Sequence, residues 1–199
     1  ALIHMHQEGV IHRDLKSSNI MRKRVPTTGR IVYKIIDLGI SLLEREVDSR
    51  LKQTVGAQMS VGFTYRTRTG LHSQQGTLDY MSPEQHSSKE AVDKRTDLWS
   101  LGVVMYQTLS GQLPFRDRND KTVEYAVANE PHVELQELLD PGTVSDELNK
   151  FVNTSLEKKR GDRFSSAKVM KEKLEEALKT STSGDIDFGN FISYRFDSD

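Results

Sequence analysis

The chain contains no cysteine among its 199 residues. This absence excludes disulfide bonds, zinc sites with Cys ligands and a Cys nucleophile. It is also typical of a reducing compartment, so we expect a cytoplasmic, intracellular location. No apolar run reaches the about 18 residues that a membrane-spanning helix needs, so we expect no membrane span. The first residues also lack the apolar region of a signal peptide, and we interpret Ala1 as a truncation point.

The sequence has no excess of charge of either sign. It contains 28 Lys and Arg against 29 Asp and Glu, which gives a formal net charge of -1. Such a balance provides no general attraction to nucleic acid or to an anionic membrane. We therefore expect no nucleic-acid partner, and any phosphate chemistry must come from the local placement of charged side chains. The oligomeric state does not follow from the composition.

The apolar pattern predicts a mainly α-helical domain with one small β-hairpin. A hairpin is expected from Asn19 to Ile36, because the β-branched residues 31–36 follow the turn signal Pro-Thr-Thr-Gly at 26–29. A short helix is expected to end near Glu8, with Gly9 as the residue that stops it. From residue 76 onward the pattern is helical.

The strongest helical signal runs from Thr96 to Leu109, which is apolar on nearly every face and therefore predicts a helix in the middle of the core. Three further helices are expected. The first is capped by Asn119 or Asp120 and has Val123, Ala126 and Val127 inward. The second has its apolar residues on one face, at Leu148, Phe151, Val152 and Leu156. The last is capped by Ser165 and has Val169, Leu174 and Leu178 inward. We expect one domain over residues 1–178 and a flexible tail over 179–199.

Residues 12–19 carry the most specific signal, with the sequence H-R-D-L-K-S-S-N. It matches H-R-D-L-x-x-x-N, the catalytic loop of protein kinases. On this string the chain resembles the large, C-terminal lobe of a serine/threonine protein kinase, over about residues 1–178. The resemblance implies that Asp14 orients the attacking hydroxyl, that Lys16 supports the γ-phosphoryl group of ATP and that Asn19 ligates Mg²⁺.

Two further motifs follow in the order that the family has. Asp37-Leu38-Gly39 resembles D-F-G, with Leu in place of Phe, and implies that Asp37 binds Mg²⁺ that bridges the phosphates of ATP. ATP and Mg²⁺ are therefore the expected cofactors. Residues 76–84, G-T-L-D-Y-M-S-P-E, resemble the family's segment up to A-P-E. Thr77 is then expected to form a hydrogen bond near Asp14 and Lys16, and the pair of Lys16 and Thr77 indicates Ser or Thr hydroxyls of proteins as substrates.

The resemblance also predicts two structural contacts. Asp97, at the start of the central helix, is expected to accept backbone hydrogen bonds from the turn at His12 and Arg13. Glu84 is expected to form a largely buried ion pair with Arg163. Neither of these two carboxylates is predicted to take part in the chemistry.

The segment from 37 to 84 is longer than the family commonly uses, because Asp37 and Ser82 lie 45 positions apart. We expect an insertion within residues 51–68. In the family, an Arg before the catalytic Asp pairs with a phosphorylated residue of this segment, which predicts such a role for Arg13. The candidate phosphorylation sites are Ser73 and Thr69, with Thr67 as a rival.

The residues to which the resemblance assigns a role in the chemistry also have a purely structural interpretation. Asp14 can cap a loop, Asp37 can end a strand, and Lys16 can be a solvated surface lysine. The histidines, for their part, have no spacing that indicates a metal site.

The sequence lacks G-x-G-x-x-G, and neither the family's strand lysine nor its helix glutamate is present. From the motifs that are present, we predict that a parent protein transfers the γ-phosphoryl group of ATP to proteins. Because the motifs that hold ATP from the other side are absent, we predict that this chain alone is inactive. The competing hypothesis is a non-catalytic scaffold that binds partners through residues 119–130 and the insertion. A third hypothesis is a lobe shared with kinases of small molecules, against which residues 76–84 indicate a protein substrate.

Overall fold

The computed structural model describes residues 1–37, 42–43, 76–87, 90–115 and 121–180. The predictions for Leu38, Gly39, the insertion at 51–68, the phosphorylation candidates Thr67, Thr69 and Ser73, the caps Asn119 and Asp120, and most of the tail lie outside these residues.

The described chain is mainly helical. Its α-helices are α1 (Leu2–Gln7), α4 (Pro83–His86), α5 (Arg95–Ser110), α6 (Val123–Asn129), α7 (Leu135–Leu138), α8 (Asp146–Ser155) and α9 (Ala167–Thr180). Single turns of 3₁₀ helix are η1 (Ser17–Asn19), η2 (Leu78–Tyr80) and η3 (Arg160–Asp162). The strands are β1 (Val10–Ile11), β2 (Ile20–Arg24), β3 (Ile31–Ile35) and β4 (Leu42–Leu43), which form two antiparallel pairs, β1 with β4 and β2 with β3.

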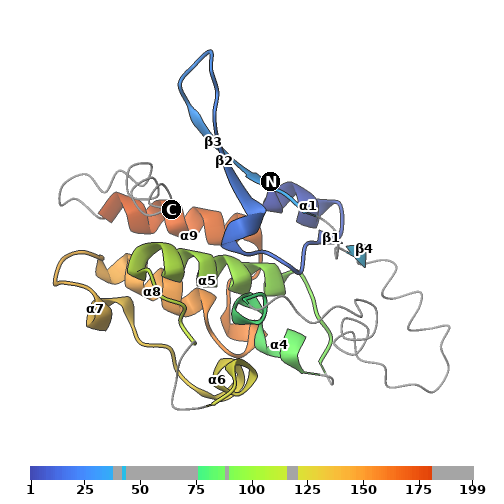
Figure 1. Cartoon of the computed structure of the whole chain (residues 1–199), viewed down its shortest axis with the longest axis vertical. Helices are drawn as coiled ribbons and strands as arrows, with labels where there is room; N and C mark the ends of the chain where they lie inside the picture. The colour runs from blue at the N-terminus through green and yellow to red at the C-terminus, as the bar shows by residue number, and fades with distance from the viewer. Residues whose placement is uncertain (38–41, 44–75, 88–89, 116–120, 181–199) are drawn as a thin grey trace.

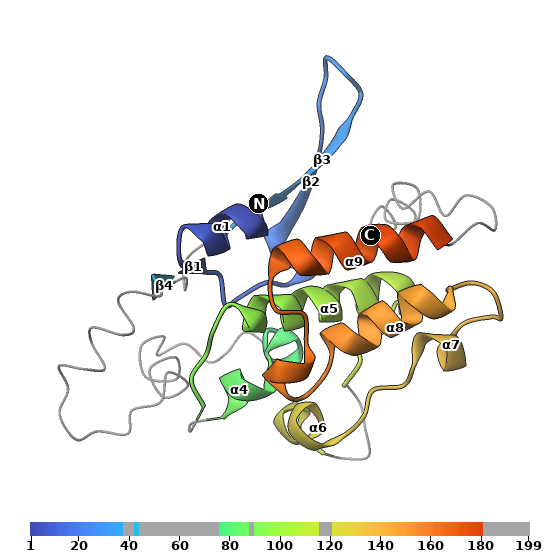
Figure 2. The ribbon, with the colours of Figure 1, turned by 180° about the vertical axis from the view of Figure 1, so that it is seen from behind.

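Helix α5 lies at the centre of the helical body, as its apolar sequence predicts. Figure 2 shows α5, α8 and α9 side by side, with α5 against α8 and α8 against α9. Leu98, Trp99 and Val103 are fully buried, and the Trp99 ring stacks on Phe115 at a centroid distance of 5.5 Å. The helix ends at Ser110, and Gly111 follows it with a φ of 76°, a left-handed conformation that glycine adopts without strain.

The β2–β3 hairpin stands away from the helical body in both views (Figures 1 and 2). Its register runs from Ile20 opposite Ile35 to Arg24 opposite Ile31. Ile20 and Ile35, at the base, pack against the core, and this contact fixes where the hairpin leaves the body. The hairpin predicted over 19–36 is therefore confirmed.

Several predicted helix details are confirmed. Helix α1 ends at Gln7, and Gly9 follows with a φ of 73°. Helix α5 extends one residue beyond each predicted end. In α8, the four predicted apolar side chains are all buried, and Ser145 caps the helix by accepting a hydrogen bond from the Leu148 N–H.

The predicted caps of the other helices are wrong by one to three residues. Thr122 caps α6, because its Oγ1 accepts the Tyr125 N–H. Ser166, not Ser165, caps α9 by accepting the Val169 N–H at 3.2 Å. A cap must be the last residue before the helical backbone conformation begins, and neighbouring Ser or Thr residues compete for that place.

The predicted inward face of α9 is also partly wrong. Leu178 is 39% exposed, whereas Ala167, Met170 and Ala177 are buried, with Leu174 partly buried between them. These four positions follow a spacing of three and four residues, which defines the buried stripe of a helix. The helix reaches Thr180, two residues past the predicted boundary at 178. None of the helices in the described part of the chain is long and apolar enough to cross a membrane.

Candidate active site

The loop from His12 to Asn19 is held by the N-terminal turn of α5. Asp97 is fully buried and accepts hydrogen bonds from the His12 N–H at 2.9 Å and the Arg13 N–H at 2.8 Å. The predicted contact of Asp97 with the turn at His12 and Arg13 is therefore present. Oδ2 of Asp97 also lies 2.8 Å from His6 Nε2 on α1. These bonds hold Arg13 at a φ of 69°, a left-handed conformation that costs a non-glycine residue about 1 kcal/mol or more.

His12 connects the same loop to the end of β3. Its Nδ1 accepts the Asp14 N–H at 3.3 Å, and its Nε2 lies 3.2 Å from the Ile36 carbonyl oxygen. Because Nδ1 accepts a hydrogen bond, Nε2 carries the proton and donates a hydrogen bond to the carbonyl oxygen. Through these two hydrogen bonds His12 brings the loop close to the residue before Asp37.

Asp14, Lys16 and Thr77 come together from two distant segments. Lys16 Nζ lies 3.0 Å from Asp14 Oδ2 and donates a hydrogen bond to Thr77 Oγ1 at 3.2 Å. Asp14 and Thr77 are each only 8% exposed, whereas the Lys16 side chain is 16% exposed. A carboxylate, an ammonium group and a hydroxyl therefore meet at a partly accessible point, where they can hold a polar or anionic substrate.

Asn19 is oriented by Asp14. Its Nδ2 donates to the Asp14 carbonyl oxygen at 2.8 Å and to Asp14 Oδ2 at 3.2 Å. These bonds fix the orientation of the amide, whose Oδ1 is the atom that can bind a cation. The Ile36 N–H donates to the Asn19 carbonyl at 2.9 Å, which places Asp37 one residue beyond the partner of Asn19.

Asn19 and Asp37 carry the oxygen atoms that could share a cation with a bound ligand. Asp37 is exposed and has a φ of 62°, at the point where the chain leaves β3. Mg²⁺ in enzymes is usually held by one or two protein groups together with phosphate oxygens and water. No group of three or more His, Cys, Asp or Glu that could hold a metal occurs among the described residues.

Arg13 has a buried guanidinium with unused donors. The residue is 6% exposed, and its Nε and Nη2 have no hydrogen-bond partner among the described residues. Burial lowers the pKa of Arg13 below its usual value, although the charge of Asp97 acts to raise it. A buried cation with unpaired N–H groups is a place where an anionic group binds favourably.

Gln85 joins the loop to α4, a role that the sequence interpretation missed. Its Nε2 donates to the Arg13 carbonyl at 2.9 Å, and its Oε1 accepts the Ser82 N–H at 3.0 Å and the Thr96 hydroxyl at 2.9 Å. Ser82 and Gln85 form the capping box of α4. The spacing S-x-x-Q, which is the sequence signature of this box, could have identified Gln85.

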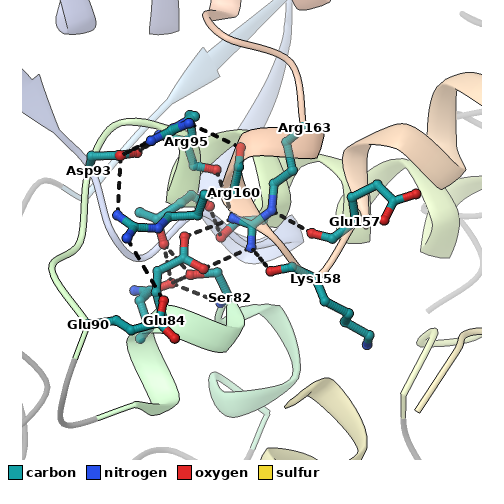
Figure 3. Close-up of polar contacts among 12 residues, drawn as sticks. Ser82, Glu84, Glu90, Asp93, Arg95, Glu157, Lys158, Arg160 and Arg163 are labelled. Carbon is teal, nitrogen blue, oxygen red and sulfur yellow. Dashed lines mark hydrogen bonds and ion pairs between the residues drawn. The ribbon is translucent and has the colours of Figure 1, made fainter. Parts of the chain in front are cut away.

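Glu84 and Arg163 form the predicted buried ion pair (Figure 3). Both Nη atoms of Arg163 donate to Glu84 at 2.8 Å, and the two side chains are 1% and 0% exposed. Arg163 also donates to the carbonyl oxygens of Glu157 and Lys158. The pair anchors the end of the segment that carries Thr77 to the region between α8 and α9.

Comparison with known proteins agrees with this geometry. The family model for the protein kinase domain matches residues 1–174. The serine/threonine-protein kinase pkn3 of Myxococcus xanthus is 33% identical over 185 residues, which cover 90% of this chain and 30% of that protein. Serine/threonine-protein kinase PknB of Mycolicibacterium smegmatis is 31% identical over 174 residues, 87% of this chain and 24% of that protein.

A third relative is the serine/threonine-protein kinase PknD of Chlamydia trachomatis serovar D, 29% identical over 179 residues, 88% of this chain and 18% of that protein. The chain thus spans less than a third of the length of these three relatives. The family model matches most of the chain, and the relatives are bacterial Ser/Thr kinases. The chain belongs to the protein kinase domain family.

Proposed function

We propose that the protein containing this chain transfers the γ-phosphoryl group of ATP to Ser or Thr hydroxyls of proteins, and that the chain supplies the large, C-terminal lobe. The observation that carries this proposal is the meeting of Asp14, Lys16 and Thr77. Their side chains approach within 3.0–3.2 Å although Lys16 and Thr77 lie 61 positions apart. A loop Asp or a solvated Lys with a merely structural role does not need this convergence.

Each of the three side chains has a task in phosphoryl transfer. The Asp14 carboxylate orients the attacking hydroxyl and accepts its proton. The Lys16 ammonium group, held beside it, compensates the negative charge of the transferred group. Thr77 fixes the position of Lys16 through its hydroxyl, and its segment continues toward the surface where a protein substrate binds.

ATP and Mg²⁺ are the cofactors of this proposal. Asn19 and Asp37 would hold the metal, which neutralises phosphate charge when it is bound. The strand alternation places Met21 and Ile36 on one face of the hairpin, next to these two residues. Both are exposed, at 49% and 36%, so the site has an apolar side against which a nucleotide base can lie.

Arg13 provides a regulatory element in the same proposal. Its buried, incompletely bonded guanidinium is suited to a phosphorylated residue of the segment between Asp37 and Ser82. Ser73 and Thr69 are the proposed sites, with Thr67 as the rival. Active protein without modification at any of these positions in a mass spectrum would contradict this part of the proposal.

The test uses the longer protein that contains this chain, with radiolabelled ATP, Mg²⁺ and a library of Ser- and Thr-containing peptides. We expect Asp14→Asn to lower kcat by about 100-fold or more, since a positioned base contributes about that much. The matched control is Asp140→Asn, because Asp140 is exposed and forms no ion pair within the described residues; it should leave kcat unchanged. Equal activity of Asp14→Asn and wild type would overturn the proposal.

The alternative of a non-catalytic scaffold predicts a different pair of results. The longer protein would then transfer no phosphate, and ATP with Mg²⁺ would not raise its melting temperature. Under our proposal ATP with Mg²⁺ raises the melting temperature, and Asp37→Asn abolishes the metal-dependent part of the shift. Residues 1–199 alone should phosphorylate no library peptide, because no segment of the chain matches the glycine-rich loop that covers the phosphates.

A further inference from the structure

The β2–β3 hairpin is strongly basic, unlike the rest of the chain. Residues 20–36 contain five cations and no Asp or Glu, namely Arg22, Lys23, Arg24, Arg30 and Lys34. The whole chain has a formal net charge of -1, so all other residues together carry -6. All five cations are exposed, on a ribbon that extends away from the helices (Figures 1 and 2).

The hairpin does not neutralise its own charge. Each cation of the strands faces an apolar residue across the ribbon, in the pairs Arg22–Tyr33, Arg24–Ile31, Lys23–Val32 and Lys34–Met21. Lys23, Arg24, Arg30 and Lys34 form no ion pair with any residue that the structure describes. Like charges on one narrow ribbon repel one another. The repulsion among Lys23, Arg24, Arg30 and Lys34 is therefore not offset by an ion pair within the described residues.

The sign of the charge decides which chains can pair with the hairpin. Charged side chains on an edge strand discourage pairing with another chain that carries the same charge. Cations alone repel a second copy of the same ribbon and attract an acidic partner. The pattern therefore selects the sign of the partner's charge.

The backbone indicates what kind of acidic partner fits. The β2–β3 sheet has two strands among the described residues, so the outer edge of each strand has N–H and C=O groups that no third strand uses. An extended peptide can pair with such an edge, whereas a lipid or a nucleic acid cannot. The turn at 26–29 also has no aromatic or large aliphatic side chain that could enter a bilayer, since it reads Pro-Thr-Thr-Gly.

We propose that the hairpin binds an extended acidic segment of a partner protein, which adds as a third strand at the outer edge of β2. This edge carries Lys23 and Arg24 on opposite faces of the sheet, so a strand alongside it can place carboxylates against both. Tyr33 and Val32, across the ribbon, offer apolar contacts to longer side chains of the segment. Lys23, Arg24, Val32 and Tyr33 are not among the residues proposed for phosphoryl transfer or for contact with the nucleotide base, so the binding does not depend on that activity.

The test measures fluorescence anisotropy of a labelled peptide with repeating Glu-Val-Glu-Thr, added to the whole protein at low salt. We expect binding that weakens as salt is added, because the contact is electrostatic. The double variant Lys23→Gln, Arg24→Gln should lose several-fold to about tenfold in affinity, as expected for two exposed ion pairs. The matched control is Lys150→Gln, Lys159→Gln, which changes the charge equally at exposed lysines outside the hairpin and should bind as wild type does.

Two further arms make the result specific. A variant with Lys23→Glu and Arg24→Glu should bind a Lys-Val-Lys-Thr peptide that wild type rejects, which shows that the variant is folded and that charge decides the contact. The Glu peptide with N-methyl groups at alternate residues should bind at least about tenfold more weakly, because strand addition needs the peptide N–H groups.

Four results would overturn the proposal. They are no binding by wild type, equal binding of a Gln-Val-Gln-Thr peptide, equal binding of the N-methylated peptide, and tighter hairpin-dependent binding of phosphatidylserine vesicles or of a DNA oligonucleotide than of the acidic peptide. The last result would assign the ribbon to a membrane or to nucleic acid instead.

Discussion

The hydroxyl oxygen of Ser17, in the loop from His12 to Asn19, lies 3.0 Å from the hydroxyl oxygen of Tyr80. The Tyr80 hydroxyl donates a hydrogen bond to Gln107 Oε1 on α5 at 2.6 Å. The Ser17 hydroxyl must therefore be the donor in its hydrogen bond with Tyr80. Ser100, also on α5, donates to the Tyr80 carbonyl oxygen at 2.8 Å. Tyr80 therefore joins the loop that carries Asp14 and Lys16 to the central helix, three residues after Thr77.

Removal of the Tyr80 hydroxyl should loosen this connection without opening the core. In Tyr80→Phe the ring remains, but Ser17 and Gln107 lose their shared partner, which should lower the free energy of unfolding by about 1–2 kcal/mol. If the proposed function holds, kcat should fall several-fold while the KM for ATP stays constant, because the loop is displaced rather than the nucleotide. Urea denaturation and steady-state kinetics of the longer protein measure the two effects.

Tyr125→Phe is the matched control, since Tyr125 is 50% exposed and its hydroxyl is not part of this network. It should change neither quantity. A double-mutant cycle of Tyr80→Phe with Ser17→Ala should show coupling, because each change removes the same bond. Additive effects on kcat would contradict a positioning role for the pair.

At Gly102, α5 packs directly against the end of α8. A Cβ atom there would lie 2.6 Å from Ser155 Cβ and 3.3 Å from Leu156 Cδ2. Gly to Ala within a helix normally stabilises by about 1 kcal/mol, but here the clash dominates, and we expect Gly102→Ala to destabilise by about 1–3 kcal/mol. Gly161→Ala, where no atom lies within 4 Å of the added Cβ, should leave the stability nearly unchanged. Thermal denaturation of both variants measures the two effects. Equal melting temperatures of the two variants would show that the helices can move apart at little cost.

The ion pair of Glu84 and Arg163 should be far more sensitive to loss of one partner than to loss of both. Arg163→Met leaves a buried carboxylate without its cation, and we expect a loss of about 3–5 kcal/mol. The double variant with Glu84→Gln removes that uncompensated charge and should be more stable than Arg163→Met alone. Lys171→Met is the control, because Lys171 and Glu175 are 62% and 55% exposed and such a pair contributes less than about 1 kcal/mol. A double variant that is less stable than Arg163→Met would contradict this account.

Contacts that belong to a motif could be predicted from the sequence. Asp97 with the loop at His12, Glu84 with Arg163, and Lys16 with Thr77 all lie where the motifs indicated. Each pair lies far apart along the chain, and periodicity gives no information on such distances. Only the recognition of a known pattern linked them.

Details that depend on local competition could not be predicted. Ser165 and Ser166 are both good caps by residue type. Ser166 caps the helix because the helical conformation begins directly after it, where Ala167 and Met170 pack into the core. The bond between Ser17 and Tyr80 also has no signal in the sequence, because a hydroxyl pair follows no spacing rule. The unused donors of Arg13 result from burial, which a sequence of charged residues does not indicate.

Asp93, just before α5, predicts how stability depends on pH. Burial acts to raise its pKa, but hydrogen bonds from Arg95 and the charges of Arg95 and Arg160 outweigh burial and lower the pKa below its usual value (Figure 3). The Arg95 Nη2 atom lies 2.6 Å from Asp93 Oδ2. Because the folded state favours the charged form, this carboxylate stabilises the fold at neutral pH.

The contribution of Asp93 should be complete above its unfolded pKa of about 4 and should be lost as the pH falls through the lower folded value. Asp93→Asn should therefore be less stable than wild type by about 1 kcal/mol at pH 7, and the difference should shrink below about pH 4, where wild type also loses the charge. Urea denaturation at a series of pH values measures this. Asp140→Asn, at an exposed carboxylate without an ion pair in the described part of the chain, should show no such convergence. A difference for Asp93→Asn that stays constant from neutral to acid pH would mean that the contact stabilises through the shape of the side chain, because only a charge-dependent contribution disappears on protonation.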